Sequence, residues 1–242
     1  MVKLNSLVRL WLEHQFPSLT NVLVLSKNTG PDFALYFSGA RIITSRTSST
    51  VHSTSSGTVS SSWGRVMGRP SIQGSPENIL FPGLYEGLCW EMEGSSGQVG
   101  IKLSQIISVR SVTVDHISQH SAFDLTCAPR EVEVWVAVTH ASPEAVAVFD
   151  RGSCDHGDGE CQGRLGDPLS SGAIGSKKRY ANLFTIIYNP YSPSSIQNFA
   201  APRHLRELNI SSSSVIFRVL GNWGSEHHTC VYRFRVHGIP VQ

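Results

Sequence analysis

The sequence has few charged residues and no long apolar run. Only 16% of its 242 residues are charged, and the formal net charge is +2. Lys and Arg are scattered, which excludes the basic, aromatic-rich patch typical of nucleic-acid binding. The candidate membrane segments, 7–12 and 22–25, are far short of the roughly 20 apolar residues of a membrane-spanning helix. A signal-peptide core with its cleavage site is also missing. We therefore expect a soluble protein, or a fragment whose membrane segment lies upstream.

Catalytic and metal-binding motifs are missing as well. The sequence contains no G-x-S-x-G elbow, H-E-x-x-H motif, Walker loop or dinucleotide fingerprint, so we do not expect an enzyme. Its five cysteines show no C-x-x-C zinc spacing. Cys154 and Cys161 enclose D-H-G-D-G-E, which fits neither a zinc site nor an EF-hand and leaves a local disulfide or a solvated loop. His227 and His228 are adjacent, so on a strand their side chains would point to opposite faces. We therefore do not expect them to share a metal ion.

Alternating hydrophobicity is what the sequence does have. Apolar residues alternate with small or polar ones in five stretches: 99–103, 112–116, 132–138, 215–219 and 232–236. A period of two indicates half-buried antiparallel strands. The 21 Gly and 12 Pro suit many short turns. The sequence therefore predicts an all-β antiparallel sandwich.

Three segments depart from this pattern. Residues 4–15 have apolar side chains at helical spacing and predict a short amphipathic helix that ends before Pro17. In residues 44–62, 14 of 19 positions are Ser or Thr, which predicts a surface loop that is mobile or becomes ordered on binding. Residues 150–181 predict an inserted surface loop. The sequon at Asn209 matters only in the secretory lumen.

Four separated motifs resemble those of SUN domains, over about residues 21–242. The motifs are G-N-W-G at 221–224 with T-C-V-Y-R-F-R-V-H-G at 229–238, D-F-A-L with S-G-A at 32–40, C-W with two glycines at 89–97, and V-D-H at 114–116 with A-P-R-E at 128–131. The resemblance implies a galactose-binding-like, jelly-roll-type sandwich that forms a homotrimer. It also implies that residues 1–20 lead in from an upstream coiled coil.

The resemblance further implies a non-catalytic role in binding the C-terminal tail of a KASH-type partner. A lid at about 46–79 would pair with the tail as a β-hairpin, and the sandwich would hold the terminal carboxylate. The residues matching the family's carboxylate site are His116, Cys127, His228 and Tyr232. The family commonly has Ser at the Cys127 position and Tyr at the His228 position. A thiol is a weaker donor than a hydroxyl, and a histidine donates more strongly when protonated.

Other family features match by position. The resemblance implies a disulfide between Cys89 and Cys230, and Thr47 stands where some members have a lid cysteine, so we expect a noncovalent complex. It also implies a monovalent cation, K⁺, held by backbone carbonyls of Asn78, Phe81, Gly83, Leu88 and Tyr232. The implied location is the perinuclear space, which favours disulfides. There the domain would be anchored in the inner nuclear membrane through an upstream segment and would link the nucleus to the cytoskeleton.

Two alternatives remain open at the level of sequence. One is a lectin-like module on the same scaffold, because a fold does not determine a function. Its exposed aromatic candidates are Trp135, Tyr188 and Tyr191. The other is a SUN domain that oligomerises but has lost tail binding, since two of the four carboxylate-site positions differ from the family.

Overall fold

The computed structural model describes residues 30–51, 74–141, 145, 165–166, 180–208 and 210–241. The chain divides into two compact units, Met1–Pro31 and Asp32–Gln242, and all the elements named below belong to the second. Outside the described residues lie the predicted helix at 4–15, residues 52–73 of the predicted lid, Cys154, Cys161 and Asn209. Within the described part of the chain, no helix is long and apolar enough to cross a bilayer.

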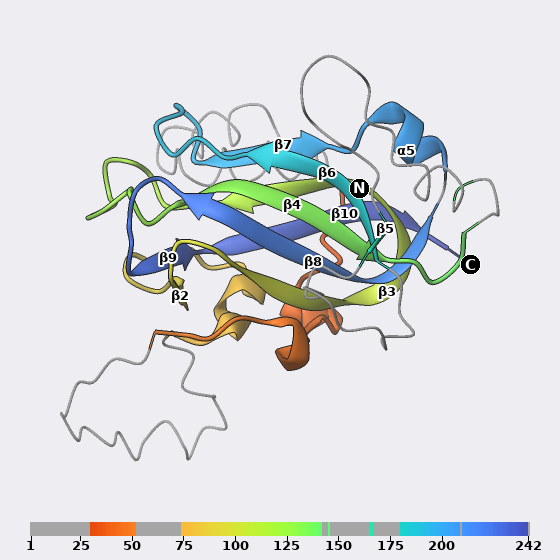
Figure 1. Cartoon of the computed structure of the whole chain (residues 1–242), viewed down its shortest axis with the longest axis horizontal. Helices are drawn as coiled ribbons and strands as arrows, with labels where there is room; N and C mark the ends of the chain where they lie inside the picture. Colours follow the sequence, from red (N-terminus) through yellow and green to blue (C-terminus); the bar gives the residue numbers. More distant parts are fainter. Residues whose placement is uncertain are drawn as a thin grey trace, which may run out of the picture. The chain divides into compact units, whose positions relative to one another are not determined.

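Strands dominate the described residues, and helices are short (Figure 1). The strands are β1 (Arg41–Ile42), β2 (Trp90–Glu93), β3 (Gly97–Asp115), β4 (Pro129–Ala137), β5 (Leu165–Gly166), β6 (Tyr180–Ile187), β7 (Ile196–Ala200), β8 (Ser211–Asn222), β9 (His228–Val231) and β10 (Arg233–Pro240). The helices are the 3₁₀ turns η1 (Tyr36–Ser38), η2 (Thr44–Arg46) and η3 (Pro76–Leu80) and the α-helix α5 (Arg203–Glu207). The predicted all-β antiparallel sandwich is confirmed.

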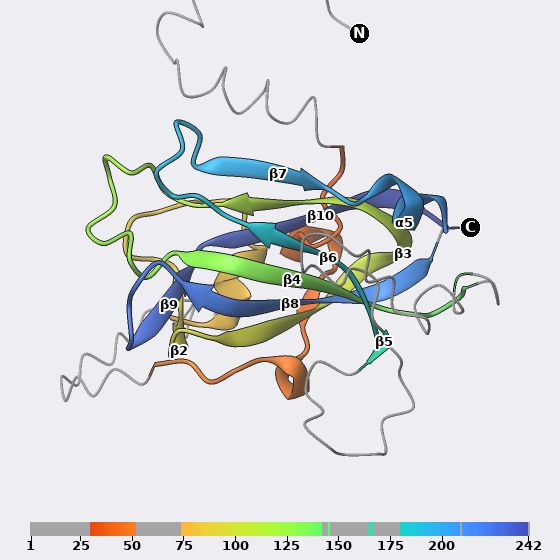
Figure 2. The same ribbon diagram turned by 45° about the horizontal axis from the view of Figure 1, so that its top comes forward.

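One long strand, β3, connects the two parts of the sandwich. Its first part pairs with β1 and β8, and β8 continues the sheet through β4, β6 and β5. Its last part pairs instead with β10 and β7. Figure 2 shows β7 and β10 following this part of β3, while β4 lies beside β8. All these pairings are antiparallel, and the register with β8 shifts between Lys102 and Ile107. The patterns at 99–103 and 112–116 thus belong to a single strand.

The alternating residues face the core, as the sequence predicts. Val132, Val134 and Val136 of β4 are 0%, 0% and 1% exposed. Phe217 of β8 and Phe234 of β10 stack with their ring centroids 4.3 Å apart, so the two parts of the sandwich meet at this pair. Burial of such side chains contributes roughly 1.5–3 kcal/mol each.

Two segments differ from the sequence prediction. The expected loop at 150–181 includes β5 and the start of β6, whose residues are nearly all buried and therefore do not alternate. The described ends of the predicted lid are also part of the sandwich. At one end, the backbone N–H of Val51 donates to the carbonyl of Glu91 (2.9 Å) and Thr50 pairs with Met92. At the other end, Ile79 is fully buried in η3. Residues 50–51 and 76–80 at the two ends of the predicted lid therefore pack as part of the sandwich.

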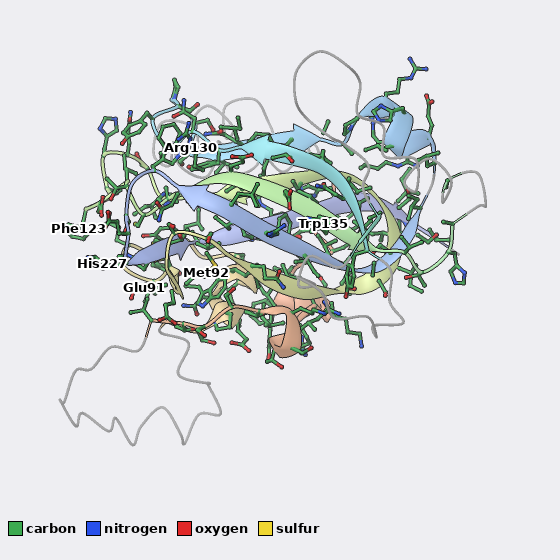
Figure 3. All side chains as sticks on the ribbon, viewed as in Figure 1. Glu91, Met92, Phe123, Arg130, Trp135 and His227 are labelled. Atoms are coloured by element: carbon green, nitrogen blue, oxygen red, sulfur yellow. A yellow bond between two sulfur atoms is a disulfide. The ribbon has the colours of Figure 1, made fainter. Side chains whose placement is uncertain are left out.

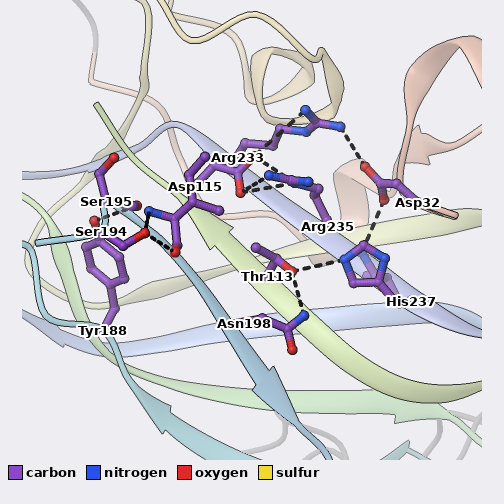
Figure 4. A network of polar contacts seen from close by, with 12 residues as sticks. Asp32, Thr113, Asp115, Tyr188, Ser194, Ser195, Asn198, Arg233, Arg235 and His237 are labelled. Atoms are coloured by element: carbon purple, nitrogen blue, oxygen red, sulfur yellow. Dashed lines mark hydrogen bonds and ion pairs between the residues drawn. The ribbon is translucent and has the colours of Figure 1, made fainter. Parts of the chain in front are cut away.

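A buried polar network joins the first family motif to the last (Figure 4). Arg235 makes a bidentate contact with Asp115, with both Nε–Oδ2 and Nη2–Oδ1 at 2.7 Å. Arg233 lies between Asp32 (2.7 Å) and Asp115 (3.8 Å). Because buried charges are tolerated only when paired, these carboxylates need their arginines. The network fixes the opening segment against β3 and β10.

Candidate functional site

The four residues that match the family's carboxylate site come from the β3–β4 connection, the start of β9 and the junction between β9 and β10. His116 follows β3, Cys127 precedes β4, His228 begins β9 and Tyr232 separates β9 from β10. We call these four residues the tail cluster. Figure 3 shows their neighbours Phe123, His227 and Glu91 together at one end of the sandwich. This end of the sandwich thus brings together residues that are as far apart in the sequence as His116 and Tyr232, which are 116 positions apart.

His116 carries an unused hydrogen-bonding atom inside the protein. The side chain is 2% exposed, its Nδ1 lies 3.1 Å from the carbonyl oxygen of Ile117, and its Nε2 has no partner. Its ring meets the Tyr232 ring edge-on with the centroids 4.6 Å apart. Burial lowers the pKa of His116, and the Ile117 hydrogen bond only partly opposes this. Buried polar atoms are normally hydrogen-bonded, and Nε2 has no such partner within the domain. It is therefore available to hydrogen-bond with a ligand.

Cys127 and Tyr232 form the apolar side of the tail cluster. Both pack with the disulfide between Cys89 and Cys230, which is present as the resemblance implies. The Cys127 thiol donates to the carbonyl of Asp124 (3.4 Å). Burial raises its pKa to about 11, so it remains a neutral thiol. Burial also raises the pKa of the Tyr232 hydroxyl, although a hydrogen bond with the Gly87 backbone partly offsets this.

A tight turn holds His228, which explains the N-W-G motif. The Asn222 side-chain amide donates to the carbonyls of Ser225 (2.7 Å) and His228 (3.1 Å), and its oxygen accepts from the Gly224 backbone (3.0 Å). Gly224 has a φ of 135°, a conformation that favours glycine. In β9, His228 pairs with Glu93 of β2. The His228 imidazole lies close enough to Asp124, in the loop before Cys127, to contribute slightly to the lowered pKa of that carboxyl.

The predicted cation loop contains an atom suited to a cation. Oδ1 of Asn78 is buried and has no donor, while its Nδ2 donates to the carbonyl of Leu88 (3.3 Å). The carbonyl of Asn78 accepts from the Phe81 backbone (3.1 Å). A carbonyl oxygen has two lone pairs, so one hydrogen bond leaves it able to coordinate an ion. Asn78, with its backbone carbonyl and its unpartnered Oδ1, therefore fits a K⁺ held by carbonyl oxygens. Among the described side chains, no group of three His, Cys, Asp or Glu could hold a metal.

The segments around the tail cluster carry exposed carboxylates, and the exposed Arg130 guanidinium lies beside them over the Trp223 ring, 5.1 Å from its centroid. The segments 84–97, 116–128 and 222–232 contain no Lys or Arg. Their carboxylates, all exposed, are Glu86, Glu91, Glu93, Asp124 and Glu226. The signal was visible in the composition of these three segments, but only the fold shows that they adjoin one another.

The aromatic candidates for a lectin-like site do not form an exposed group. Trp135 and Tyr188 are 4% and 0% exposed, so they belong to the core. Tyr191 is exposed, but its ring packs edge-on against Trp223. The lectin-like alternative therefore loses two of its three predicted residues.

Comparison with known proteins identifies the family. The chain matches the family model described as Sad1 / UNC-like C-terminal over residues 70–150 and 170–240. The chain belongs to the SUN family. It is 28% identical over 211 residues to SUN domain-containing protein 3 of Mus musculus, covering 86% of this chain and 52% of that protein. It is also 28% identical over 215 residues to SUN domain-containing protein 1 of Homo sapiens, covering 87% of this chain and 22% of that protein.

The SUN chain therefore spans about half or less of the length of these curated relatives. Among solved structures it is similar to the family 32 carbohydrate-binding module from Streptococcus pneumoniae EndoD. That likeness has a TM-score of 0.45 and 11% identity, and it covers 86% of this chain and 99% of that chain.

Proposed function

We propose that this SUN chain is a non-catalytic tail-binding domain. It binds the C-terminal tail of a KASH-type protein in the perinuclear space and so contributes to a link between nucleus and cytoskeleton. The observation that carries the proposal is the unpartnered, buried Nε2 of His116 beside Tyr232, with Cys127 and His228 in the adjoining connections. Family membership supports the choice of partner.

Neutral His116 defines how a carboxylate would be held. Its Nδ1 faces a carbonyl oxygen and so carries the proton, which leaves Nε2 as an acceptor in the free protein. A carboxylate also only accepts, so the two groups pair only when Nε2 gains a proton. Tail binding is therefore coupled to proton uptake at His116, with the negative charge of the carboxylate stabilising the imidazolium. Cys127 and His228 would donate weaker or charge-dependent hydrogen bonds.

Assembly and cation binding belong to the same proposal. We expect a homotrimer, since linked tails would then bind with greater avidity. A K⁺ ion would lie among the carbonyls of the cation loop and would hold that loop against Tyr232. Thr47 cannot form a disulfide, so the complex would be noncovalent. The upstream segment would anchor the domain in the inner nuclear membrane.

The test is a titration of the purified domain with a synthetic KASH-type tail peptide that has a free C-terminal carboxylate. The same peptide amidated at its C-terminus is the control. We expect binding that amidation abolishes, and we expect His116→Ala to weaken it while His120→Ala, in the same loop but exposed, does not. Equal binding of both peptides would contradict carboxylate recognition. Binding of neither would leave the alternative of a SUN domain that only oligomerises.

A further inference from the structure

Three of the five cysteines pack in one buried cluster that overlaps the tail cluster. Cys89 and Cys230 form the disulfide, and Cys127 is a buried free thiol. Ile117 and Tyr232 complete this group of buried residues. Since a thiolate attacks the sulfur of a disulfide, the domain holds a nucleophile and its target packed together. We call Cys89, Cys127 and Cys230 the sulfur triad.

The backbone places Cys127 next to one particular member of the disulfide. The N–H of Cys230 donates to the carbonyl of Cys127 (2.8 Å). Segments joined by such a bond lie about 5 Å apart, and disulfides join Cα atoms about 4.4–6.8 Å apart. Burial, and after it the charge of Asp124, raises the pKa of Cys127, whereas the Cys230 N–H lowers it, so the Cys127 sulfur faces the Cys230 backbone. The position therefore fits a disulfide between Cys127 and Cys230.

We propose that the sulfur triad undergoes internal thiol–disulfide exchange, in which Cys127 replaces Cys89 as the partner of Cys230. Cys127 loses its proton to solvent, and its sulfur attacks the sulfur of Cys230. The Cys127–Cys230 bond forms as the Cys89–Cys230 bond breaks. The electron pair leaves on the Cys89 sulfur, which takes up a proton. One thiol and one disulfide are present before and after, so the step needs neither an oxidant nor a reductant.

The two disulfide isomers differ both in the tail cluster and in the cation loop. In the isomer of this structure, the Cys127 thiol is a hydrogen-bond donor of the tail cluster, and Cys89 ties the end of the cation loop to β9. In the exchanged isomer that donor is lost. Cys89, which follows the exposed Leu88, is then a free thiol. One step therefore alters the tail cluster and releases the cation loop. The exchange itself stands whether or not the domain binds a tail.

Burial of Cys127 makes the exchange slow at neutral pH. Its pKa of about 11 leaves only a small fraction as the attacking thiolate. Below this pKa, the thiolate fraction and with it the rate of exchange should rise about tenfold for each pH unit. The isomer of this structure can therefore persist near neutral pH although the second pairing is within reach.

The first experiment follows the exchange in the domain with Cys154→Ser and Cys161→Ser, so that only the sulfur triad remains. The folded domain is held between about pH 8 and about pH 9.5 with N-ethylmaleimide, which traps released Cys89, and is then digested without reduction. Trypsin leaves the three cysteines on separate peptides, 66–102, 111–130 and 219–233. Mass spectrometry should find the last two linked and Cys89 alkylated, at a rate that rises about tenfold per pH unit. Adding Cys127→Ser should abolish both products.

The second experiment isolates the new pairing by adding Cys89→Ser to the same background. In a glutathione buffer, the ratio of the Cys127–Cys230 disulfide to glutathione adducts should be at least about tenfold higher for the folded domain than in guanidinium, because folding raises the effective concentration of the two thiols. An equal ratio in the two states would overturn the proposed pairing. A linked pair in this variant that never appears in the three-cysteine domain would overturn the exchange. If Cys89→Ser does not fold, the three-cysteine domain decides alone, and failure of Cys89 to become alkylated there overturns the proposal.

Discussion

Arg233 and Asp32 lie 201 residues apart in the sequence and form an ion pair with Nη2 and Oδ2 2.7 Å apart. The other oxygen of Asp32 accepts from the backbone of Val236 (3.2 Å) and of Ala34 (2.9 Å). Both charged side chains are almost fully buried, at 9% and 11% exposure. One carboxylate therefore fixes the opening segment onto the last strand.

Removing Arg233 should strongly destabilise the domain. Arg233→Met leaves the carboxylates of Asp32 and Asp115 buried with less compensation, which costs about 3–5 kcal/mol. Urea unfolding followed by fluorescence measures the change in the free energy of unfolding. The control is Arg203→Met, which removes an exposed pair with Glu207 and should change stability by less than about 1 kcal/mol. Equal losses in both variants would refute a special role for the buried pair.

The Cys89–Cys230 disulfide should contribute a large part of the stability. It connects residues 141 positions apart. Closing so long a loop stabilises the folded state by about 4–5 kcal/mol through the entropy of the unfolded chain. We expect Cys89→Ser with Cys230→Ser to lower the unfolding midpoint strongly, and dithiothreitol to have little further effect on that variant. Cys127→Ser is the control and should keep the sensitivity to reductant. Both are compared in a Cys154→Ser, Cys161→Ser background.

Acid should destabilise the domain through His116. Burial lowers the pKa of His116 below 6.5 in the folded state. At pH values between 6.5 and this lower pKa, the unfolded chain binds a proton at His116 more readily than the folded domain does. The contribution of His116 to stability is therefore complete above pH 6.5 and is lost as the pH falls towards the folded-state pKa. We expect His116→Phe to reduce the loss of unfolding free energy between about pH 7.5 and about pH 5.5. His120→Phe, which is exposed, should not. An unchanged pH dependence in His116→Phe would exclude this residue as the cause.

The Cys127 thiol should react slowly in the folded domain. Its pKa of about 11 leaves little of the reactive thiolate near neutral pH. In the Cys154→Ser, Cys161→Ser background, labelling with Ellman's reagent should be far slower for the folded domain than for the chain unfolded in guanidinium. Fast labelling of the folded domain would mean that the Cys127 connection opens readily.

K⁺ should stabilise the cation loop. We expect a higher unfolding midpoint in potassium chloride than in tetramethylammonium chloride at equal ionic strength, because an ion that binds only the folded state raises stability by mass action. Asn78→Leu, which removes the unpartnered Oδ1, should reduce the difference. An Asn189→Leu control lies in an exposed loop and should retain it. No difference between the two salts for the unmodified domain would rule out a stabilising ion.

The sequence predicted the strands in which charged residues separate the apolar ones. The alternation in β4, β8 and β10 was visible because Glu133, Arg218 and Arg235 stand between core residues, although Trp135 and Ile216 on the same faces as these charged residues are also buried. β6 is buried on both faces and so shows no period, and its first two residues, 180–181, were included in the predicted loop. The tail cluster came from the family resemblance, and the fold places its members in adjoining connections. The exposed carboxylates around it were missed, because only folding brings the three separate segments that carry them to the same end of the sandwich.

The length of β3 makes the domain a single cooperative unit. This strand pairs with β1, β7, β8 and β10, so both parts of the sandwich depend on the same 19 residues. If β3 unfolds, both parts of the sandwich lose a pairing strand. A partially unfolded form that keeps only one part is therefore unfavourable. Hydrogen exchange in β8 and β10 should therefore occur with the same opening free energy. If the domain binds a tail as proposed, force applied through that tail would act on the whole sandwich, and we expect it to unfold in a single step.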